Sequence, residues 1–287
     1  MPEPAIPAET LERTAPAGSS LDYALRLAPR QRRGALQAVA AFSGEIRRVP
    51  LTTSEPDVAR ARLHWWRTEL ARILDGGGDH PLAAPLAAAV RAHGLPGAEL
   101  RALLDEADRV LDGDRPATFA EQREHAERYG AAPLRLAARI LAGEDAEATA
   151  HATALGSATG LTRNLRLQGW AARHGDSDLP QARLEEAGVP GQGPLLQADG
   201  QAQPALLEAL AAQAQAIAPL YPQAARQAPA GRARRRALHP LTGYAAIHQA
   251  LLAEIRRRGP AELIRGRITL PPLRKAWIAW RGRIATP

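Results

Sequence analysis

The chain has 287 residues, a formal net charge of +7, no cysteine and only 4% aromatic residues. The absence of cysteine excludes disulfides, thiolate metal sites and cysteine nucleophiles. The length fits one large or two small domains, and a composition rich in alanine, leucine and arginine favours helices over strands, which prefer β-branched and aromatic side chains.

The amino-terminal segment, residues 1–19, contains several prolines and acids and lacks an apolar core. It resembles neither a secretory signal nor a transit peptide, and we expect it to be flexible. No stretch of the sequence approaches 18 uninterrupted apolar residues, so no transmembrane helix is predicted. We therefore expect a cytoplasmic protein, with a peripheral position at the inner face of the membrane left open.

Two helices are predicted directly after this segment. Ser20 is expected to cap a short helix that ends near Pro29, and Pro50 is expected to stop the longer helix that follows. The longer helix has apolar residues at helical spacing along one face. These residues are Ala35, Val39, Phe42, Ile46 and Val49.

The next helices are marked by clear start and stop signals. Ser54 precedes a helix that a run of three glycines from Gly76 should end, and Gly94 should end the helix after it. The first of these has a buried stripe consisting of Ala59, Leu63, Trp66, Leu70 and Ile73. Thr118 begins a capping box, TFAE, whose helix is expected to kink around Gly130 and Pro133.

A long helix is predicted from about residue 150 onward. Apolar residues recur there at i, i+4, i+7 and i+11, namely at Ala154, Ala158, Leu161 and Leu165. Gly156 and Gly160 lie one turn apart, so we expect a neighbouring backbone to approach closely. A second face of the same helix carries Thr159, Arg163, Arg166 and Trp170.

The remainder of the chain also reads as helical. Gly188–Pro204 is expected to be a long loop, because it is rich in Gly, Pro and Gln and has no periodicity. Helices are predicted over Ala205–Gln227, Thr242–Gly259 and Pro271–Arg281. No strand-period segment or internal repeat appears, so the sequence predicts an all-α protein with a single domain.

The segment from Leu161 to Pro180 resembles the second aspartate-rich motif of the squalene/phytoene synthase family, LTNxLRDxxxDxxxGRxYLP, without a gap. The matching positions are Leu161, Thr162, Leu165, Arg166, Gly175, Leu179 and Pro180. The two metal-binding aspartates of the motif fall on Leu167 and Ala171. The motif is therefore kept in outline but without its carboxylates.

Other segments extend this resemblance over residues 20–280. Phe42 matches the family's first aspartate motif, but Arg47 and Arg48 stand where its leading aspartates would be. Leu63–Leu70 resembles a WRxEL helix, and the sequence that ends at residue 270 resembles the closing helices. The resemblance implies a terpenoid-synthase-like helical bundle with a central cavity, formed by residues 20–287.

Active members of the family join two isoprenoid diphosphates, and bound Mg²⁺ neutralises the departing diphosphate. Because both aspartate pairs are missing, we expect no catalytic residue, no metal ligand and no cofactor here. The sequence is more similar to a divergent branch of the family that includes an assembly factor of respiratory complex I. Candidate ligand-binding residues are Arg47, Arg48, Trp65, Arg67, Arg163 and Arg166.

Three functions remain open at this point. The first is a catalytically degenerate protein that binds an isoprenoid or lipid ligand or a protein partner. The second is an active prenyl transferase with displaced Mg²⁺ ligands, for which Asp108 and Asp112 offer a DxxxD pair that could equally be a solvated acidic face. The third is a peripheral-membrane adaptor, because residues 226–287 hold 14 basic and 2 acidic residues, although these arginines could also form an ordinary solvated surface.

No motif for nucleic-acid binding is present. The arginine-rich stretch that begins at Gly231 lacks interleaved aromatic residues. The tryptophans near the end of the chain, Trp277 and Trp280, suit the interface of a membrane, although they share a helix face that could equally pack in the core. We therefore expect no nucleic-acid partner.

Overall fold

A computed structural model describes residues 6–53, 55–173, 177–189, 195–196, 202–266, 268–282 and 284. Within these residues the only regular secondary structure is helical, and the sole β contact is an isolated bridge between Leu196 and Ala202. The all-α prediction is confirmed. None of the helices in the described ranges has a segment long and apolar enough to cross a membrane.

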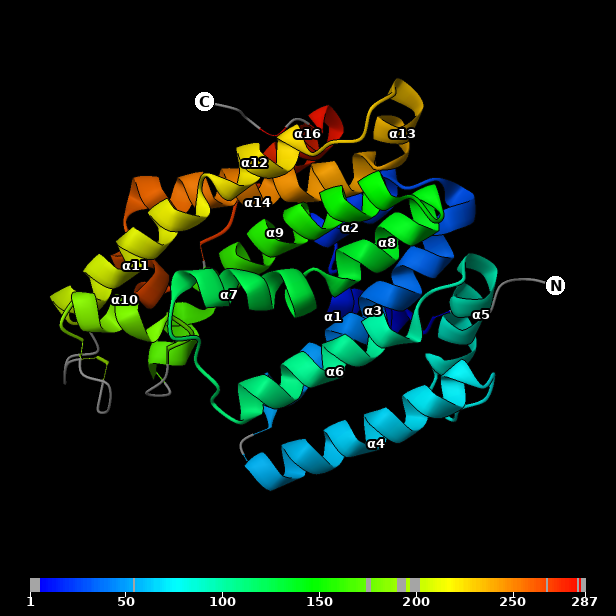
Figure 1. Cartoon of the computed structure of the whole chain (residues 1–287), viewed down its shortest axis with the longest axis horizontal. Helices are drawn as coiled ribbons and strands as arrows, with labels where there is room; N and C mark the ends of the chain where they lie inside the picture. The colour runs from blue at the N-terminus through cyan, green and yellow to red at the C-terminus, as the bar shows by residue number, and fades with distance from the viewer. Residues whose placement is uncertain are drawn as a thin grey trace.

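Residues 8–111 contain the first six α-helices (Figure 1). They are α1 (Ala8–Thr14), α2 (Ser20–Leu27), α3 (Arg30–Thr52), α4 (Pro56–Leu74), α5 (Ala83–His93) and α6 (Gly97–Leu111). The segment expected to be flexible thus contains α1, which is attached to α3 by an ion pair of 3.2 Å between Arg13 and Glu45. The cap of α2 is Ser19 rather than Ser20, because the Ser19 hydroxyl accepts a hydrogen bond from the Asp22 amide at 3.1 Å.

Proline at position 50 does not stop α3, which continues to Thr52. A proline removes its own amide donor and its ring crowds the carbonyl four residues earlier, but so close to the end of a helix this disturbs only the last turn. The apolar faces predicted for α3 and α4 are buried as expected, and Phe42 and Ile46 are completely inaccessible to solvent. Burying such a side chain contributes on the order of 1.5–3 kcal/mol.

A break in helical geometry occurs where the kink was predicted. The helix α7 (Phe119–His125) continues into a π-helical turn, η1 (Ala126–Gly130), before α8 (Ala132–Ala142). The predicted cap at Thr118 is confirmed, since the Glu121 amide donates to the Thr118 hydroxyl at 3.2 Å, but the Glu121 carboxylate accepts from the Ala117 amide, at 2.7 Å, in place of the Thr118 amide of a capping box. Such π-helical turns are frequent at functional sites.

The long helix α9 (Ala146–Arg173) runs through the middle of the molecule (Figure 1). It packs against α8, η1, α12, α14 and α15. The carboxyl-terminal helices are α10 (Gln181–Glu186), α11 (Pro204–Ile217), α12 (Leu220–Arg226), α13 (Arg232–Ala237), α14 (His239–Arg258), α15 (Ala261–Arg265) and α16 (Pro272–Arg281). With α3 and α8 on one side and α12 and α14 on the other, α9 forms the centre of the core (Figure 1).

Three expectations about this half are corrected. The helix predicted over Ala205–Gln227 is two helices, because Pro219 cannot donate the next backbone hydrogen bond. The helix α14 begins three residues before Thr242, at His239, and α13 was not predicted. Of the expected loop Gly188–Pro204, residues 190–194 and 197–201 lie outside the described ranges.

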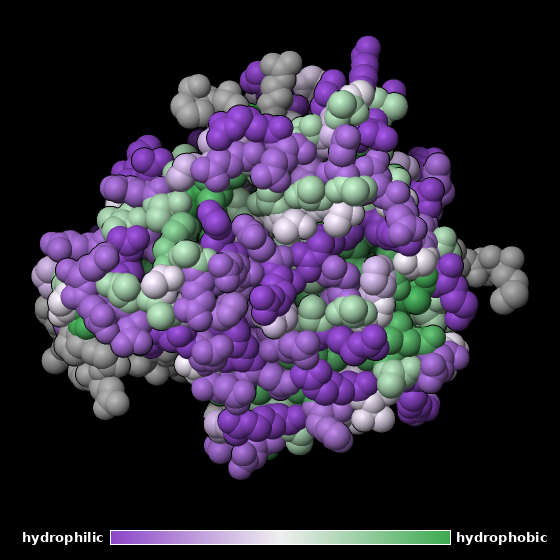
Figure 2. Space-filling view, viewed as in Figure 1, coloured by the Kyte–Doolittle hydropathy of each residue, from purple (hydrophilic) through white to green (hydrophobic). Residues whose placement is uncertain are grey.

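The surface is mainly polar over the face seen in Figure 1. Figure 2 shows hydrophilic side chains over most of this face, with hydrophobic ones gathered between the helices. This distribution matches helices that each bury one apolar stripe against α9 or α3.

Candidate functional site

A cavity of about 370 Å³ lies between α3, α6, η1 and α9. Residues at the carboxyl end of α1 also line it, among them Arg13. Its apolar wall is formed by side chains from α3, α6 and α9. These side chains include Leu51, Leu103, Val110, Leu161, Leu167, Trp170 and Ala171.

Three arginines give this cavity a positive wall. Arg47 and Arg48 come from α3, and Arg163 comes from α9. In the part of the chain that the structure describes, none of the three has a carboxylate partner. Repulsion from Arg163, together with burial, lowers the pKa of Arg47 to about 9. The folded protein thus holds like charges close together, at a free-energy cost that a bound anion would relieve.

Of the described carboxylates that line the cavity, those of Glu106 and Asp178 are paired with Arg109, and Asp114 lies near the same guanidinium, which donates to its backbone carbonyl. The Glu106 carboxylate accepts two hydrogen bonds from Arg109, at 3.0 and 3.1 Å. Asp178 lies 4.0 Å from Arg109 and accepts a hydrogen bond from the Asn164 amide at 2.8 Å. Because these acids are neutralised within the wall, they do not offset the charge of Arg47 and Arg163.

Two residues of α9 stand where the resemblance places the family's metal-binding aspartates. Leu167 and Ala171 on α9 both line the cavity and present apolar groups to it. Across the described ranges, no three His, Cys, Asp or Glu side chains come together in a way that could hold a metal ion. The described donor set therefore does not fit a pair of Mg²⁺ ions, which prefer several carboxylate oxygens.

A polar side chain with an unsatisfied atom also faces the cavity. His125, the last residue of α7, lines it beside η1, and its buried Nδ1 atom has no hydrogen-bond partner among the described residues. A buried polar atom without a partner is costly, so this nitrogen is available to a ligand. Next to it, the Gln122 amide donates to the Asp178 carbonyl at 2.7 Å, which fixes the end of the loop that follows α9.

The six candidate residues are not brought together as one group. Arg47, Arg48 and Arg163 line the cavity, whereas Trp65 and Arg67 lie outside it. Trp65 is 46% exposed and its ring packs edge-on against Trp66. On the same helix, the Arg67 guanidinium forms ion pairs with Asp105 and Asp108 of α6. Arg67 therefore belongs to the α4–α6 contact, whereas Trp65 lies at the surface beside Trp66 and the His80 ring.

Arg166 likewise has a structural position. Its guanidinium donates to the Ile268 carbonyl at 2.8 Å, which attaches the segment after α15 to α9. Near it, His248 on α14 is buried, and its Nδ1 atom lies 2.9 Å from the Tyr244 carbonyl. Burial, with the charges of Arg166, Arg163 and Arg47, lowers the pKa of His248 to about 3. The His248 imidazole is consequently uncharged and adds no further positive charge beside these three arginines.

The DxxxD pair on α6 also has a structural role. Asp108 pairs with Arg67, and Asp112 lies 3.3 Å from Arg60 of α4. Both carboxylates thus face α4 rather than a second acidic pair. Exposed ion pairs of this kind contribute little, typically below about 1 kcal/mol each.

Sequence reasoning missed several residues of the cavity. Arg13, Glu106, Arg109, His125 and Tyr129 line it but carry no motif of their own. The spacing of Glu106 and Arg109, three residues apart on one helix, indicated an ion pair but not its position. The expected kink was the best available signal for His125 and Tyr129, since both lie at η1.

Comparison with known proteins shows which family and which relatives the chain resembles. The family model for squalene/phytoene synthase matches residues 14–274. The NADH dehydrogenase (ubiquinone) complex I assembly factor 6 of Homo sapiens is 29% identical over 141 residues, which make up 49% of this chain and 42% of that protein. The chain thus matches less than half the length of that relative. A presqualene diphosphate synthase of Rhodopseudomonas palustris is 27% identical over 190 residues, or 66% of this chain and 68% of that protein.

Solved structures show the same architecture. A crystal structure of a dehydrosqualene synthase in complex with ligand has a TM-score of 0.78 at 19% identity, and the match covers 96% of this chain and 94% of that chain. A squalene synthase, HpnC, from Alicyclobacillus acidocaldarius has a TM-score of 0.71 at 19% identity over 88% of this chain and 92% of that chain. At this identity the likeness establishes the fold alone.

Proposed function

The chain belongs to the squalene/phytoene synthase family, and we propose that it is a catalytically degenerate member, which binds an anionic isoprenoid or lipid in its central cavity without metal-dependent prenyl transfer. The observation that carries this proposal is the juxtaposition of Arg47 and Arg163 on facing helices with no carboxylate partner among the described residues. A phosphate or diphosphate placed between them would relieve their repulsion.

The rest of the cavity suits the hydrocarbon part of such a ligand. Leu103, Val110 and Leu167 provide an apolar wall that continues from the arginines. The volume of about 370 Å³ lies at the lower end of the range of small-molecule sites. An amphiphile with one charged end therefore matches both the charge and the shape of the cavity.

The chemistry of this site favours binding of a diphosphate but not its departure in prenyl transfer. Prenyl transfer requires the diphosphate to leave, and Mg²⁺ ions held by carboxylates stabilise it as charge develops. The arginine guanidinium can bind a phosphate through two parallel hydrogen bonds, but it cannot hold a metal ion. Arg47 and Arg163 would thus retain the ligand in its ground state, and no cofactor is required for binding.

Titration calorimetry with farnesyl thiolodiphosphate, a non-hydrolysable diphosphate, tests this proposal. We expect binding that EDTA leaves unchanged and that the pair Arg47→Ala and Arg163→Ala weakens at least tenfold. The matched control pair, Arg62→Ala and Arg91→Ala, removes two exposed arginines from α4 and α5 and should bind like the wild type. Binding that requires Mg²⁺, or squalene or phytoene formed from labelled substrate, would instead support the active prenyl transferase.

A role in protein assembly is the second candidate, and the similarity to the complex I assembly factor favours it. In this role the chain would act from the cytoplasm on a protein partner at the inner face of the membrane. Cells that lack the chain should then show less assembled NADH dehydrogenase on native gels, and expression of the wild-type chain should restore it. An unchanged level of the assembled enzyme would argue against this role.

A further inference from the structure

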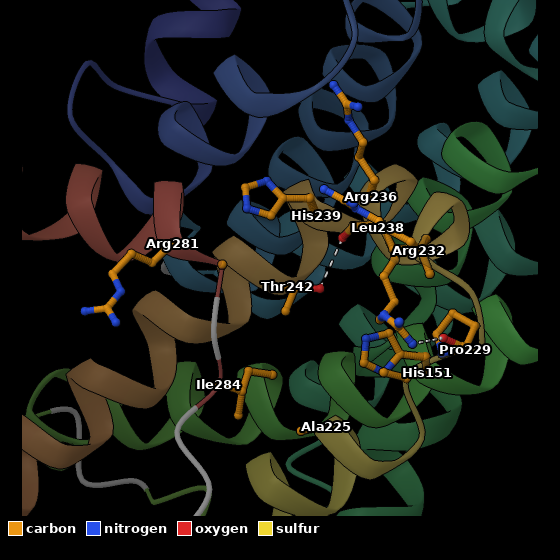
Figure 3. Close-up of a pocket in the computed structure, with 13 residues that line it drawn as sticks. His151, Ala225, Pro229, Arg232, Arg236, Leu238, His239, Thr242, Arg281 and Ile284 are labelled. Carbon is orange, nitrogen blue, oxygen red and sulfur yellow. Dashed lines mark hydrogen bonds between the residues drawn. The ribbon is translucent and has the colours of Figure 1, made fainter.

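A second hollow, of about 710 Å³, lies on the other side of the molecule from α4, between α13, α14, α16 and the amino-terminal half of α9 (Figure 3). We call it the basic groove. Among the residues that the structure describes, no aspartate or glutamate lines it. Its basic residues are His151, Arg232, Arg235, Arg236, His239 and Arg281. Figure 3 shows Arg232 and Arg236 on one side of the hollow and Arg281 on the opposite side.

Most of the charge in the basic groove is not compensated within the protein. Arg232, Arg236 and Arg281 have no ion-pair partner in the described ranges, and Arg235 donates only to the Pro229 carbonyl, at 3.3 Å. The neighbouring Arg234 differs, because it does not line the groove and pairs with Asp145 and Glu147 of the α9 region, each at 3.1 Å. One arginine of α13 thus attaches the helix to the body, and the others remain available to an external anion.

An exposed apolar stripe lies beside the basic groove. Leu273, Trp277 and Trp280 of α16 are 85%, 56% and 65% exposed, and their spacing places them on one face of the helix. We call these three residues the α16 stripe. The Trp277 and Trp280 rings are 5.3 Å apart, and the Arg281 guanidinium lies 5.6 Å from the Trp277 ring centre. Arg281 therefore belongs to both surfaces, which form one continuous patch.

The stripe is a consequence of how α16 packs. Its opposite face is buried through Ala279, whose carbonyl lies against Gly243 of α14, where an added Cβ would come within 2.9 Å. This close contact fixes the rotation of the helix, so Leu273 and the two tryptophans must face outward. An exposed patch of large apolar side chains bordered by cations is unusual for a protein surface without a partner.

We propose that the basic groove and the α16 stripe together form a docking surface for an anionic lipid bilayer. The arginines would bind headgroup phosphates, and the tryptophans and Leu273 would enter the interface between headgroups and acyl chains. A soluble polyanion would satisfy the arginines but would leave the α16 stripe in water. A bilayer with anionic lipids offers phosphates to the arginines and, next to them, an apolar layer to the α16 stripe. This combination favours a bilayer as the occupant.

Vesicle co-sedimentation with the full chain tests this surface. We expect strong binding to vesicles of equal parts phosphatidylcholine and phosphatidylglycerol, weak binding to phosphatidylcholine alone, and a decrease at high salt. The triple variant Arg232→Ala, Arg236→Ala and Arg281→Ala should lose on the order of 100-fold in partitioning, given the usual contribution of each basic residue at such a surface. The control variant removes three exposed arginines elsewhere, Arg62, Arg91 and Arg101, and should bind like the wild type.

A second variant separates a bilayer from other polyanions. Trp277→Ala with Trp280→Ala should reduce vesicle binding and remove the blue shift of tryptophan fluorescence that insertion produces, while the melting curve stays unchanged because both rings are exposed. Three results would overturn the proposal. They are equal loss in the control variant, binding that is independent of anionic lipid, and vesicle binding that is unaffected by the tryptophan substitutions. Tighter binding to duplex DNA than to the vesicles would likewise reject the bilayer as the occupant.

Discussion

The substitution Gly156→Ala tests the closest helix contact of the core. A Cβ added at Gly156 would lie 2.6 Å from both the Cα and the Cβ of Ala131, at the junction of η1 and α8. Carbon atoms in contact are ordinarily about 3.5–4.0 Å apart, so the two backbones would have to separate by roughly 1 Å. Overpacking of this kind costs about 1–3 kcal/mol.

The substitution Gly160→Ala, one turn further along α9, is the matched control. A Cβ there would lie 3.9 Å from the Gly130 Cα, which is an ordinary contact. Both substitutions gain about 1 kcal/mol of helix propensity, so this gain cancels in their comparison. We expect Gly156→Ala to be less stable than Gly160→Ala by about 1–3 kcal/mol, with Gly160→Ala as stable as the wild type or slightly more so.

Urea denaturation followed by circular dichroism at 222 nm measures this difference. The midpoint should fall for Gly156→Ala with an unchanged slope, since the denatured state is the same. Equal midpoints for the two variants would refute the reasoning, because they would mean that η1 can move away from α9 at no cost. Both glycines face a neighbouring backbone, as expected, but only at Gly156 is there no room for a methyl group.

Three further variants address other parts of α9 and its neighbours. Gly169→Ala should cost about 3 kcal/mol or more in urea denaturation, because its Cβ would lie 2.0 Å from the Leu263 carbonyl oxygen, whereas the matched change Gly160→Ala should not. The pKa of His248 is about 3 in the folded protein and near 6.5 in the unfolded chain. Below pH 6.5 the unfolded chain therefore binds a proton that the folded protein does not. The free energy of unfolding should then fall as the pH decreases, by up to about 1.4 kcal/mol per pH unit. His248→Gln should remove this slope between pH 6.5 and 5, and an equal slope in the variant would assign it to other groups. The pair Leu167→Asp and Ala171→Asp should not yield squalene or phytoene from farnesyl or geranylgeranyl diphosphate with Mg²⁺, since α3 still presents arginines; a product would show that one carboxylate pair is sufficient.

The sequence predicted the buried faces of the helices because burial imposes a period that can be counted. The stripes through Phe42 and Trp66 are buried in the structure, and both helices were expected near their observed bounds. The division between α11 and α12 was missed because the apolar pattern continues across Pro219. The additional helix α13 was missed because a run of arginines has no apolar face, and its packing depends on Arg234 reaching Glu147.

The site was less predictable, because periodicity indicates which face of a helix is buried but not what it faces. Arg163 and Arg166 are three residues apart and were assigned to one face, yet one lines the cavity and the other binds the Ile268 carbonyl. The charge of Arg67 is likewise used in the α4–α6 contact, through carboxylates 38 and 41 residues away in the sequence. Only tertiary packing decides which arginines have internal partners.

The residues that keep the family pattern are those that hold the helices together. Thr162 donates to the Ala158 carbonyl, and its hydroxyl lies 2.8 Å from the buried Tyr221 hydroxyl of α12. Glu69, in the WRxEL segment, is buried and accepts hydrogen bonds from the Asp79 and His80 amides at 2.6 and 2.7 Å. Loss of either would leave a buried polar group unpaired, at a cost of about 1–3 kcal/mol.

The family's aspartates carry no such structural cost. At Leu167 and Ala171 the side chains face the cavity, so a carboxylate there can be exchanged for an apolar group without unpairing any other residue. The stability of the fold therefore depends on Thr162 and Glu69 whether or not the protein is a catalyst. Because of this, the family match determines the fold, and the charge of the cavity wall, set by Arg47 and Arg163, is the feature that bears on its chemistry.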